Sequence, residues 1–247
     1  MKLLIDFGNS RCKWAQLVDG GLQNFKAHAY SSDDAMLRAC EVSQCLPLDK
    51  VDEVHAISVL GEEFENAFQQ QLETKFSRRA IFYIPQANQF GVKLAYSNPL
   101  SYGVDRYAAL VAVHHQYEGV KLVVDCGTAV TMDVIKANGQ HLGGLILPGL
   151  DLMCSSLSGK ASGIPECSAN QQAALLNDYT VNAVYSGCAL TLQHGLNGII
   201  QDIKRNIQQE ITLCATGGGS DMIKNSEMQY IDCPNLVLEG LQIMQSA

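Results

Sequence analysis

The sequence has no basic block and no long apolar run, and each absence excludes a class of partner. Charged residues make up 17% of the 247 residues, and the formal net charge is -8. Basic residues gather only in isolated pairs such as Arg78-Arg79 and Lys204-Arg205, so we expect no nucleic-acid partner. No apolar run approaches the roughly 20 residues of a membrane span, so we expect no membrane partner either.

Several familiar motifs are also missing. The nine cysteines include no C-x-x-C pair, and Cys126 and Cys188 lie among apolar or small residues, which indicates buried, reduced thiols. The sequence has no G-x-x-x-x-G-K-[ST] motif and therefore lacks the phosphate-binding lysine of P-loop kinases. Lys13, in the second predicted strand, is either a phosphate contact or a solvated side chain. The first residues, MKLLID, hold no long apolar segment and no cleavage site, so we expect no signal peptide and a cytoplasmic protein.

The sequence does contain an alternation of predicted strands and helices, and this alternation occurs twice. The first half predicts strands at 2-6, 12-18, 25-30, 53-59 and 80-84, and helices at 33-45, 62-76 and 104-116. The second half predicts strands at 121-126, 129-136, 141-147 and 211-215, and helices at 149-158, 178-208 and 235-245. We therefore predict an α/β fold of two similar halves, 1-117 and 118-247, without a flexible linker between them.

A carboxylate stands at the same place in both halves. The apolar run KLLID ends on Asp6 before Gly8, and LVVD ends on Asp125 before Gly127. A charge at the end of a buried strand is costly unless it is compensated, and a glycine turn lets backbone N–H groups approach an anion. One D-x-G would indicate a plain strand end. The duplication favours two turns that grip a nucleotide's phosphates from both sides, with the carboxylates facing the accompanying magnesium ion directly or through water.

The loop before the helix at 104-116 carries residues suited to catalysis. In YSNPLSYGVDRYAAL, Asp105 and Arg106 stand at a helix start, where N–H groups and the dipole favour anions. A kinase acting on an alcohol needs a carboxylate to accept the hydroxyl proton, and we predict that Asp105 does so. Arg106 suits a substrate carboxylate. The alternative is an ordinary first-turn Asp followed by a surface Arg.

Five motifs occur in a fixed order: DFGN at 6-9, GVDR at 103-106, DCGTAVTMD at 125-133, GGLILPG at 143-149 and TGG at 216-218. Together they resemble type III pantothenate kinase, a family of the superfamily of sugar kinases, actin and heat-shock chaperone ATPases. The resemblance implies two duplicated ribonuclease-H-like halves, each a mixed sheet with helices, around a central nucleotide cleft. It implies phosphorylation of pantothenate by ATP to 4'-phosphopantothenate, the first step of coenzyme A biosynthesis. It also implies a homodimer that needs magnesium and a monovalent cation, K+ or NH4+.

The resemblance further implies roles for individual residues. Asp105 is the catalytic residue, Asp125 binds the monovalent cation, and Asp6 binds magnesium, directly or through water. Two departures are mild: Ser10 stands where the family usually has threonine, and Tyr102 where an aliphatic residue commonly precedes the glycine. The implied pantothenate contacts are Tyr96, Gly103, Val104, Asp105, Arg106 and Thr180, and the implied nucleotide contacts are Asp6, Gly8, Asn9, Ser10, Arg11, Cys12, Lys13, Gly127 and Thr128.

Three alternatives stay open. Thr180 is either a substrate contact or a helix cap. TGGGS at 216-220 either brings the backbone close to a nucleotide or forms a plain turn. On the same scaffold, another small-molecule kinase would differ in the loop at 96-106, whereas a non-catalytic regulator would have no need of the intact Asp6, Asp105 and Asp125.

Overall fold

The computed structural model describes residues 1–161, 163–167, 172–224 and 229–246, and the chain divides into two compact units. Unit 1 comprises Met1–Tyr117, Asn138–Gly143 and Asn235–Ala247, and unit 2 comprises Glu118–Ala137 and Gly144–Pro234. The domain boundary expected between residues 117 and 118 stays a prediction. By contacts, two segments from beyond it, 138–143 and 235–247, group with unit 1.

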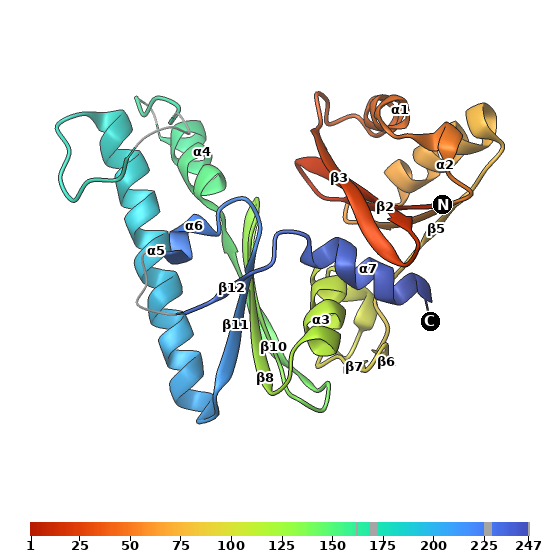
Figure 1. The fold of residues 1–247 in the computed structure, drawn as a ribbon. Helices are drawn as coiled ribbons and strands as arrows, with labels where there is room; N and C mark the ends of the chain where they lie inside the picture. Colours follow the sequence, from red (N-terminus) through yellow and green to blue (C-terminus); the bar gives the residue numbers. More distant parts are fainter. Residues whose placement is uncertain (162, 168–171, 225–228, 247) are drawn as a thin grey trace. The chain divides into compact units, whose positions relative to one another are not determined.

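Unit 1 is built on a mixed five-stranded sheet in the order β3-β2-β1-β4-β5 (Figure 1). The first strand pairs antiparallel with the second and parallel with the fourth. Asp19 and Gly20 form the turn between the second and third strands, and both have positive φ, 51° and 82°, as a two-residue hairpin turn requires. The third strand therefore begins at Gly21, before the predicted start at residue 25. The strands are β1 Lys2–Phe7, β2 Arg11–Val18, β3 Gly21–Ala29, β4 Glu53–Ser58 and β5 Ala80–Phe82.

Four helices cover this sheet. Helices α1 (Ala35–Cys45) and α2 (Glu62–Phe76) pack on one face, where Phe7 meets two rings of α2, Phe64 and Phe68, each edge-on at a centroid distance of 4.9 Å. Helices α3 (Val104–Gln116) and α7 (Leu236–Ser246) pack on each other and contact the sheet. The short elements of unit 1 are the 3-10 helices Leu48–Lys50 and Pro99–Ser101, with β6 Asn88–Gln89 and β7 Val92–Lys93.

Unit 2 repeats the sheet of unit 1. Its strand order is β10-β9-β8-β11-β12, and β8 again pairs antiparallel with the strand that follows it and parallel with β11. The long helix α5 packs Leu192, Leu196 and Ile200 against β8 and β9. The strands are β8 Val120–Cys126, β9 Ala129–Ile135, β10 His141–Pro148, β11 Ile211–Thr216 and β12 Ile231–Asp232, and the helices are α4 Leu150–Lys160, α5 Thr180–Ile207 and α6 Asp221–Lys224.

The two sheets have the same strand order. In each sheet the first strand pairs antiparallel with the next strand of the chain and parallel with a later strand, which pairs parallel with the edge strand. The predicted fold class, two duplicated α/β halves with mixed sheets, is thereby confirmed. No helix in the described part of the chain is long and apolar enough to cross a membrane.

Candidate functional site

The first predicted carboxylate lies near the end of β1. Asp6 stands directly opposite Lys13 of β2, so both side chains lie on the same face of the sheet. The neighbouring Ile5 and Phe7 point to the opposite face and belong to the core beneath α1 and α2. Asp6 is 8% exposed. A largely buried carboxylate therefore has a lysine at the cross-strand position beside it.

A tight turn links β1 to β2 directly after this carboxylate. The Gly8 N–H donates to the Arg11 carbonyl oxygen at 3.1 Å, and Asn9 and Ser10 are exposed at the turn. Cys12 is fully buried in the core beneath α1 and α2. Its side chain therefore faces away from any ligand of the turn, and only its backbone is available to one.

The second turn repeats this arrangement in unit 2. Asp125 stands opposite Thr131 of β9, while Val124 and Cys126 on either side face the core beneath α5. The Gly127 N–H donates across the turn to the Ala129 carbonyl oxygen at 3.1 Å. Both carboxylates thus occupy the penultimate position of a first strand, on the face away from α1 and α2 in unit 1 and from α5 in unit 2.

The glycines of TGGGS lie against this second turn. Gly217 has φ +87°, and a Cβ at this residue would be 2.5 Å from the Asp125 Oδ1 and 2.5 Å from the Cys126 carbonyl oxygen. The Gly219 N–H donates to the same Cys126 carbonyl at 2.9 Å. Only a residue without a side chain fits at 217, because both the backbone angle and the space exclude a Cβ.

A further glycine packs on the other side of the same turn. The Gly149 N–H donates to the Thr128 carbonyl oxygen at 3.0 Å. A Cβ at this residue would be 2.5 Å from the carbonyl oxygens of Gly127 and Thr128. Glycines from GGLILPG and TGGGS therefore enclose the Asp125 turn. Close packing on this turn explains why both motifs have glycine at these positions.

The thiols that follow the two carboxylates stay protonated. Burial raises the pKa of Cys126 to about 12, and the negative charge of Asp125 adds to this shift. Burial likewise raises the pKa of Cys12 to about 12, with a smaller contribution from Asp6. All nine cysteines lie in the described part of the chain and are free thiols. Cys126 and Cys188 are buried, as expected, whereas Cys45 is exposed and Cys40 and Cys167 are half-buried.

The predicted substrate loop places its charged residues at the start of α3. Gly103 is the N-cap residue, and Val104 is the first residue of the helix. The Asp105 Oδ1 accepts from the Arg106 N–H at 2.7 Å, and a Cβ at Gly103 would be 2.6 Å from the same oxygen. The glycine therefore lets the Asp105 carboxylate lie back over the helix start, where N–H groups stabilise negative charge.

Arg106 is buried, which differs from the surface arginine of the alternative interpretation. Its side chain is held over an aromatic ring, with the guanidinium carbon 4.5 Å from the centroid of the Tyr102 ring. The Tyr96 ring meets Tyr102 edge-on at 4.9 Å. Unit 1 therefore brings Tyr96, Asp105 and Arg106 into one loop region around Tyr102.

Thr180 is the first residue of α5 and is exposed, and the cap position before it is occupied by Tyr179. The predicted residues thus divide between the units. Unit 1 holds Asp6, Gly8, Asn9, Ser10, Arg11, Cys12, Lys13, Tyr96, Gly103, Val104, Asp105 and Arg106, and unit 2 holds Asp125, Gly127, Thr128 and Thr180.

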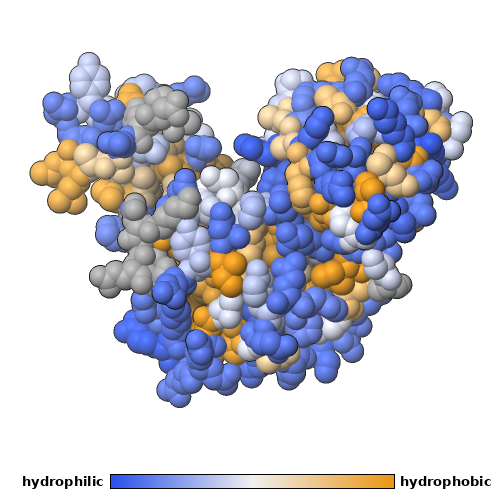
Figure 2. Space-filling view, in the orientation of Figure 1, coloured by the Kyte–Doolittle hydropathy of each residue, from blue (hydrophilic) through white to orange (hydrophobic). Residues whose placement is uncertain are grey.

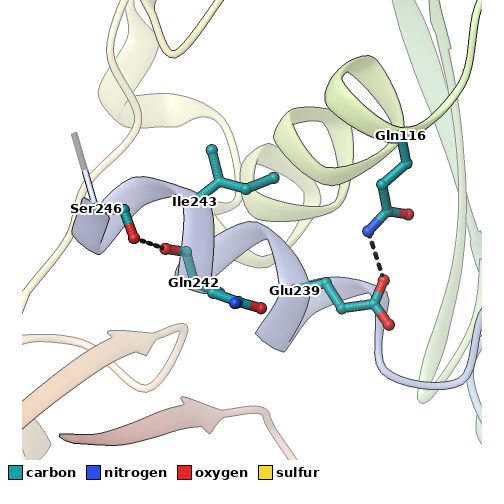
Figure 3. Close-up of a pocket in the computed structure, with 5 residues that line it drawn as sticks. All are labelled: Gln116, Glu239, Gln242, Ile243 and Ser246. Carbon is teal, nitrogen blue, oxygen red and sulfur yellow. Dashed lines mark hydrogen bonds between the residues drawn. The ribbon is translucent and has the colours of Figure 1, made fainter. Parts of the chain in front are cut away.

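A surface hollow of unit 1 lies along α7, apart from these residues (Figure 3). It is lined by Gln116, Glu239, Gln242, Ile243 and Ser246. The Gln116 Nε2 donates to Glu239 Oε2 at 2.9 Å, and the Gln242 Nε2 donates to the Gly20 carbonyl oxygen at 2.7 Å. These hydrogen bonds hold α7 against α3 and against the β2–β3 turn. The polar groups of the hollow therefore have a structural role.

Metal binding by protein ligands alone finds little support. Within the described ranges, no group of three His, Cys, Asp or Glu residues is placed to hold a metal ion. A cation at Asp6 or Asp125 would need ligands from water, backbone or phosphate oxygens besides the one carboxylate. This is how magnesium commonly binds beside nucleotide phosphates.

Comparison with known proteins identifies the family. The family model for type III pantothenate kinase matches residues 2–202. The chain belongs to the type III pantothenate kinase family. A type III pantothenate kinase of Nitrosococcus oceani is 33% identical over 98% of this chain and 92% of its own length. One of Pseudomonas aeruginosa (strain LESB58) is 31% identical over 98% of both chains.

Solved structures show the same fold at lower identity. A Campylobacter jejuni protein assigned to the Baf family of transcriptional activators superposes with a TM-score of 0.60 at 21% identity, over 99% of this chain and 98% of that chain. The Lmo2764 protein of Listeria monocytogenes, a candidate N-acetylmannosamine kinase, gives 0.51 at 12% identity over 99% of both chains. The likeness to these two structures is one of fold, and it extends over nearly the whole of this chain.

Sequence reasoning missed two residues of the substrate loop region. Tyr102 was noted only as a departure from the family pattern, and His141 was not singled out. Both are buried, at 2% and 1% exposure, and their rings lie 5.2 Å apart. The unusual tyrosine was the available signal, but nothing in the sequence links it to a histidine of β10.

Proposed function

We propose that the chain phosphorylates pantothenate at the expense of ATP, yielding 4'-phosphopantothenate in the first step of coenzyme A biosynthesis, with Asp105 as the catalytic base. Kinase activity on pantothenate is the activity of the family to which the chain belongs. The cytoplasm is the compartment that fits this metabolic role.

One observation carries the assignment of the base and the substrate carboxylate contact. The Asp105 carboxylate and the buried Arg106 occupy adjacent positions at the start of α3. A carboxylate there can accept the proton of an attacking hydroxyl, and a guanidinium one residue away can bind a carboxylate through paired N–H donors. Pantothenate has both groups, a hydroxyl to be phosphorylated and a carboxylate. We propose Tyr96, Gly103, Val104 and Thr180 as its further contacts.

We propose that the two turns bind ATP. The first turn offers backbone N–H groups, Lys13 and the polar side chains of Asn9 and Ser10, and the second offers Gly127 and Thr128. Glycine at each turn lets phosphate oxygens reach the backbone. Arg11 is exposed at the first turn, and Cys12 contributes through its backbone.

We propose Asp6 as the magnesium residue, directly or through water, and Asp125 as the residue for a monovalent cation, K+ or NH4+. Carboxylate oxygen is the donor that hard cations prefer, which fits both assignments. Bound magnesium would neutralise charge on the phosphates. The glycine at 217 leaves the Asp125 Oδ1 uncovered by a side chain from that position, where a Cβ would lie 2.5 Å from it.

We propose that the chain works as a homodimer through unit 2. Large hydrophobic side chains are exposed on the segment before α5, where Leu175, Leu176 and Tyr179 are 86%, 88% and 73% exposed, and hydrophobic surface is visible at the left of Figure 2. Exposed apolar groups gathered on one region commonly mark an interface. Light scattering should report about twice the chain mass of 26.8 kDa, and a monomer at assay concentration would contradict this proposal.

Replacement of Asp105 tests the proposed chemistry. Asp105→Asn keeps the size and removes the base, so kcat for pantothenate should fall by about 10²-fold or more. Arg106→Ala should mainly raise KM for pantothenate, because its contact also holds the ground state. The measurement is ADP release with pantothenate, compared with a panel of sugars and short acids that would reveal a different kinase. A regulator on this scaffold would release no ADP with any of them.

A matched control separates catalysis from helix electrostatics. Asp151 holds the same position in α4 as Asp105 in α3, the second residue after a glycine N-cap. Asp151→Asn therefore removes a similar favourable dipole interaction, worth about 0.3–1 kcal/mol, but no proposed base. It should keep kcat within about 3-fold of the wild type, since such a surface effect leaves the chemistry intact. Equal losses in both variants would contradict the assignment of Asp105.

A further inference from the structure

Arg106 is held in a contact that resemblance to the family did not predict. Its guanidinium carbon lies 4.5 Å from the centroid of the Tyr102 ring. Arg106 is 7% exposed and Tyr102 is 2% exposed, so the pair is largely removed from water. A cation over a ring face is attracted most strongly under this condition.

The Tyr102 ring is itself fixed by two other rings. Tyr96 meets it edge-on, with centroids 4.9 Å apart and planes at 65°. His141, at the start of β10, lies 5.2 Å away and is 1% exposed. Tyr96 and His141 also stack on each other at 6.2 Å. Rings in such mutual contact restrict one another's rotation, because protein interiors are closely packed.

The backbone fixes the spacing between the ring and the arginine. The Tyr102 N–H donates to the Pro99 carbonyl oxygen at 3.0 Å and closes the short 3-10 helix. The Gly103 carbonyl oxygen accepts from the Tyr107 N–H at 3.0 Å and opens α3. The backbone of Tyr102 is therefore held between two closed turns, which fixes where its side chain leaves the main chain relative to α3.

An aliphatic side chain at position 102 could pack against the stem of Arg106 but would offer no ring face to its charge.

We propose that Tyr102 is a positioning residue that aims the Arg106 guanidinium at the substrate carboxylate. This rests on the proposed function, in which Arg106 binds the carboxylate of pantothenate. The ring attracts the cation through its face, whereas carboxylate oxygens bind the N–H donors in the guanidinium plane. The two contacts are compatible. Tyr102 therefore determines how strongly the enzyme selects acids over neutral analogues.

Two variants and two substrates test this proposal. Tyr102→Leu installs the aliphatic residue and removes the ring face, and Tyr102→Phe keeps the ring face without the hydroxyl. Each is assayed with pantothenate and with its alcohol analogue, in which CH2OH replaces the carboxylate and the phosphorylated hydroxyl is unchanged. Tyr30→Leu serves as the control for lost packing, because it removes a similar contact, between Tyr30 and Arg38 at 4.4 Å.

The expected result is selective. Tyr102→Leu raises KM for pantothenate about 10-fold, within the range of a desolvated cation–π contact, while kcat changes less than about 2-fold because Asp105 is untouched. KM for the alcohol analogue stays unchanged. Tyr102→Phe restores the wild-type KM, and Tyr30→Leu leaves KM for pantothenate unchanged. Fluorescence of Trp14, the single tryptophan and a residue of β2 in unit 1, verifies that each variant is folded.

Three results would overturn the proposal. One is an unchanged KM for pantothenate in Tyr102→Leu. Another is an equal rise in KM for both substrates, which would indicate a loosened loop rather than a misaimed arginine. The third is a KM in Tyr102→Phe as high as in the leucine variant. Wild-type turnover of pantothenate in the same assay separates these results from a failure of the proposed function, since a wild type without turnover would overturn both.

Discussion

Gly217→Ala is expected to destabilise unit 2 strongly, because the added methyl group meets two obstacles. The residue has φ +87°, a region that costs an L-residue with a side chain roughly 1–2 kcal/mol. The new Cβ would also lie 2.5 Å from both the Asp125 Oδ1 and the Cys126 carbonyl oxygen. Overpacking of this kind costs about 1–3 kcal/mol. The two contributions together predict a loss of about 2–5 kcal/mol in the free energy of unfolding.

Gly218→Ala is the matched control for this prediction. Gly218 neighbours Gly217, is exposed, and has nothing within 4 Å of a Cβ. Its replacement should change the free energy of unfolding by less than about 0.5 kcal/mol, as at an ordinary surface position. Urea unfolding followed by far-UV circular dichroism measures both variants, with the transition of unit 2 fitted separately if the units unfold in two steps.

Turnover of pantothenate provides a second test of the steric clash between a Cβ at position 217 and the Asp125 carboxylate. If the Cβ of Gly217→Ala displaces the Asp125 carboxylate, the proposed cation site is distorted, and the K+ concentration needed for half-maximal turnover should rise. In Gly218→Ala it should not change. Equal stabilities and equal K+ dependence in the two variants would refute the reasoning, because the close approach of Gly217 to Asp125 would then have no energetic consequence.

Two further predictions concern unit 1. Gly240→Ala should lower the free energy of unfolding by about 3 kcal/mol, since a Cβ there would be 1.9 Å from the Ala108 carbonyl oxygen. Trp14 fluorescence in urea measures this loss. Gly198→Ala, in open space on α5 of unit 2, should instead be neutral or stabilising, as measured by far-UV circular dichroism in urea. Hydrogen bonds from His55 and then Lys2 lower the pKa of Glu53, so its stabilising effect is present above pH about 4.5 and is lost as pH falls through the lowered pKa. Glu53→Gln should therefore flatten the acid limb of thermal stability, and an unchanged limb would contradict this.

Much of the fold follows from local patterns. The helices predicted at 62-76 and 104-116 coincide with α2 and α3, because each has a glycine N-cap before a periodic apolar stripe that ends in a clear change of pattern. The start of β3 was predicted less well, at residue 25 instead of Gly21. The turn before it needs only Asp19 and Gly20, and the exposed side chains of β3 give little alternation to mark its start.

Other features depend on contacts between distant segments. The hairpin of β6 and β7 has strands of two residues each, too short for a pattern of alternation. The close approach of Gly217 to Asp125 joins residues of β8 and the loop after β11, and the pair Tyr102 and His141 joins a loop to β10. Local propensity carries no information on such pairs, so the roles of these residues appear only with the tertiary structure.

The two copies of the carboxylate turn share a backbone plan but differ in the charge that surrounds them. Asp6 stands opposite Lys13, so one unit positive charge is built into the first turn on the same face as the carboxylate. Asp125 stands opposite Thr131, and its turn is enclosed by the glycines 149, 217 and 219. The position opposite the second carboxylate thus carries a hydroxyl group where the position opposite the first carries an ammonium group. The shared backbone plan therefore places a different cross-strand side chain beside the carboxylate in each unit.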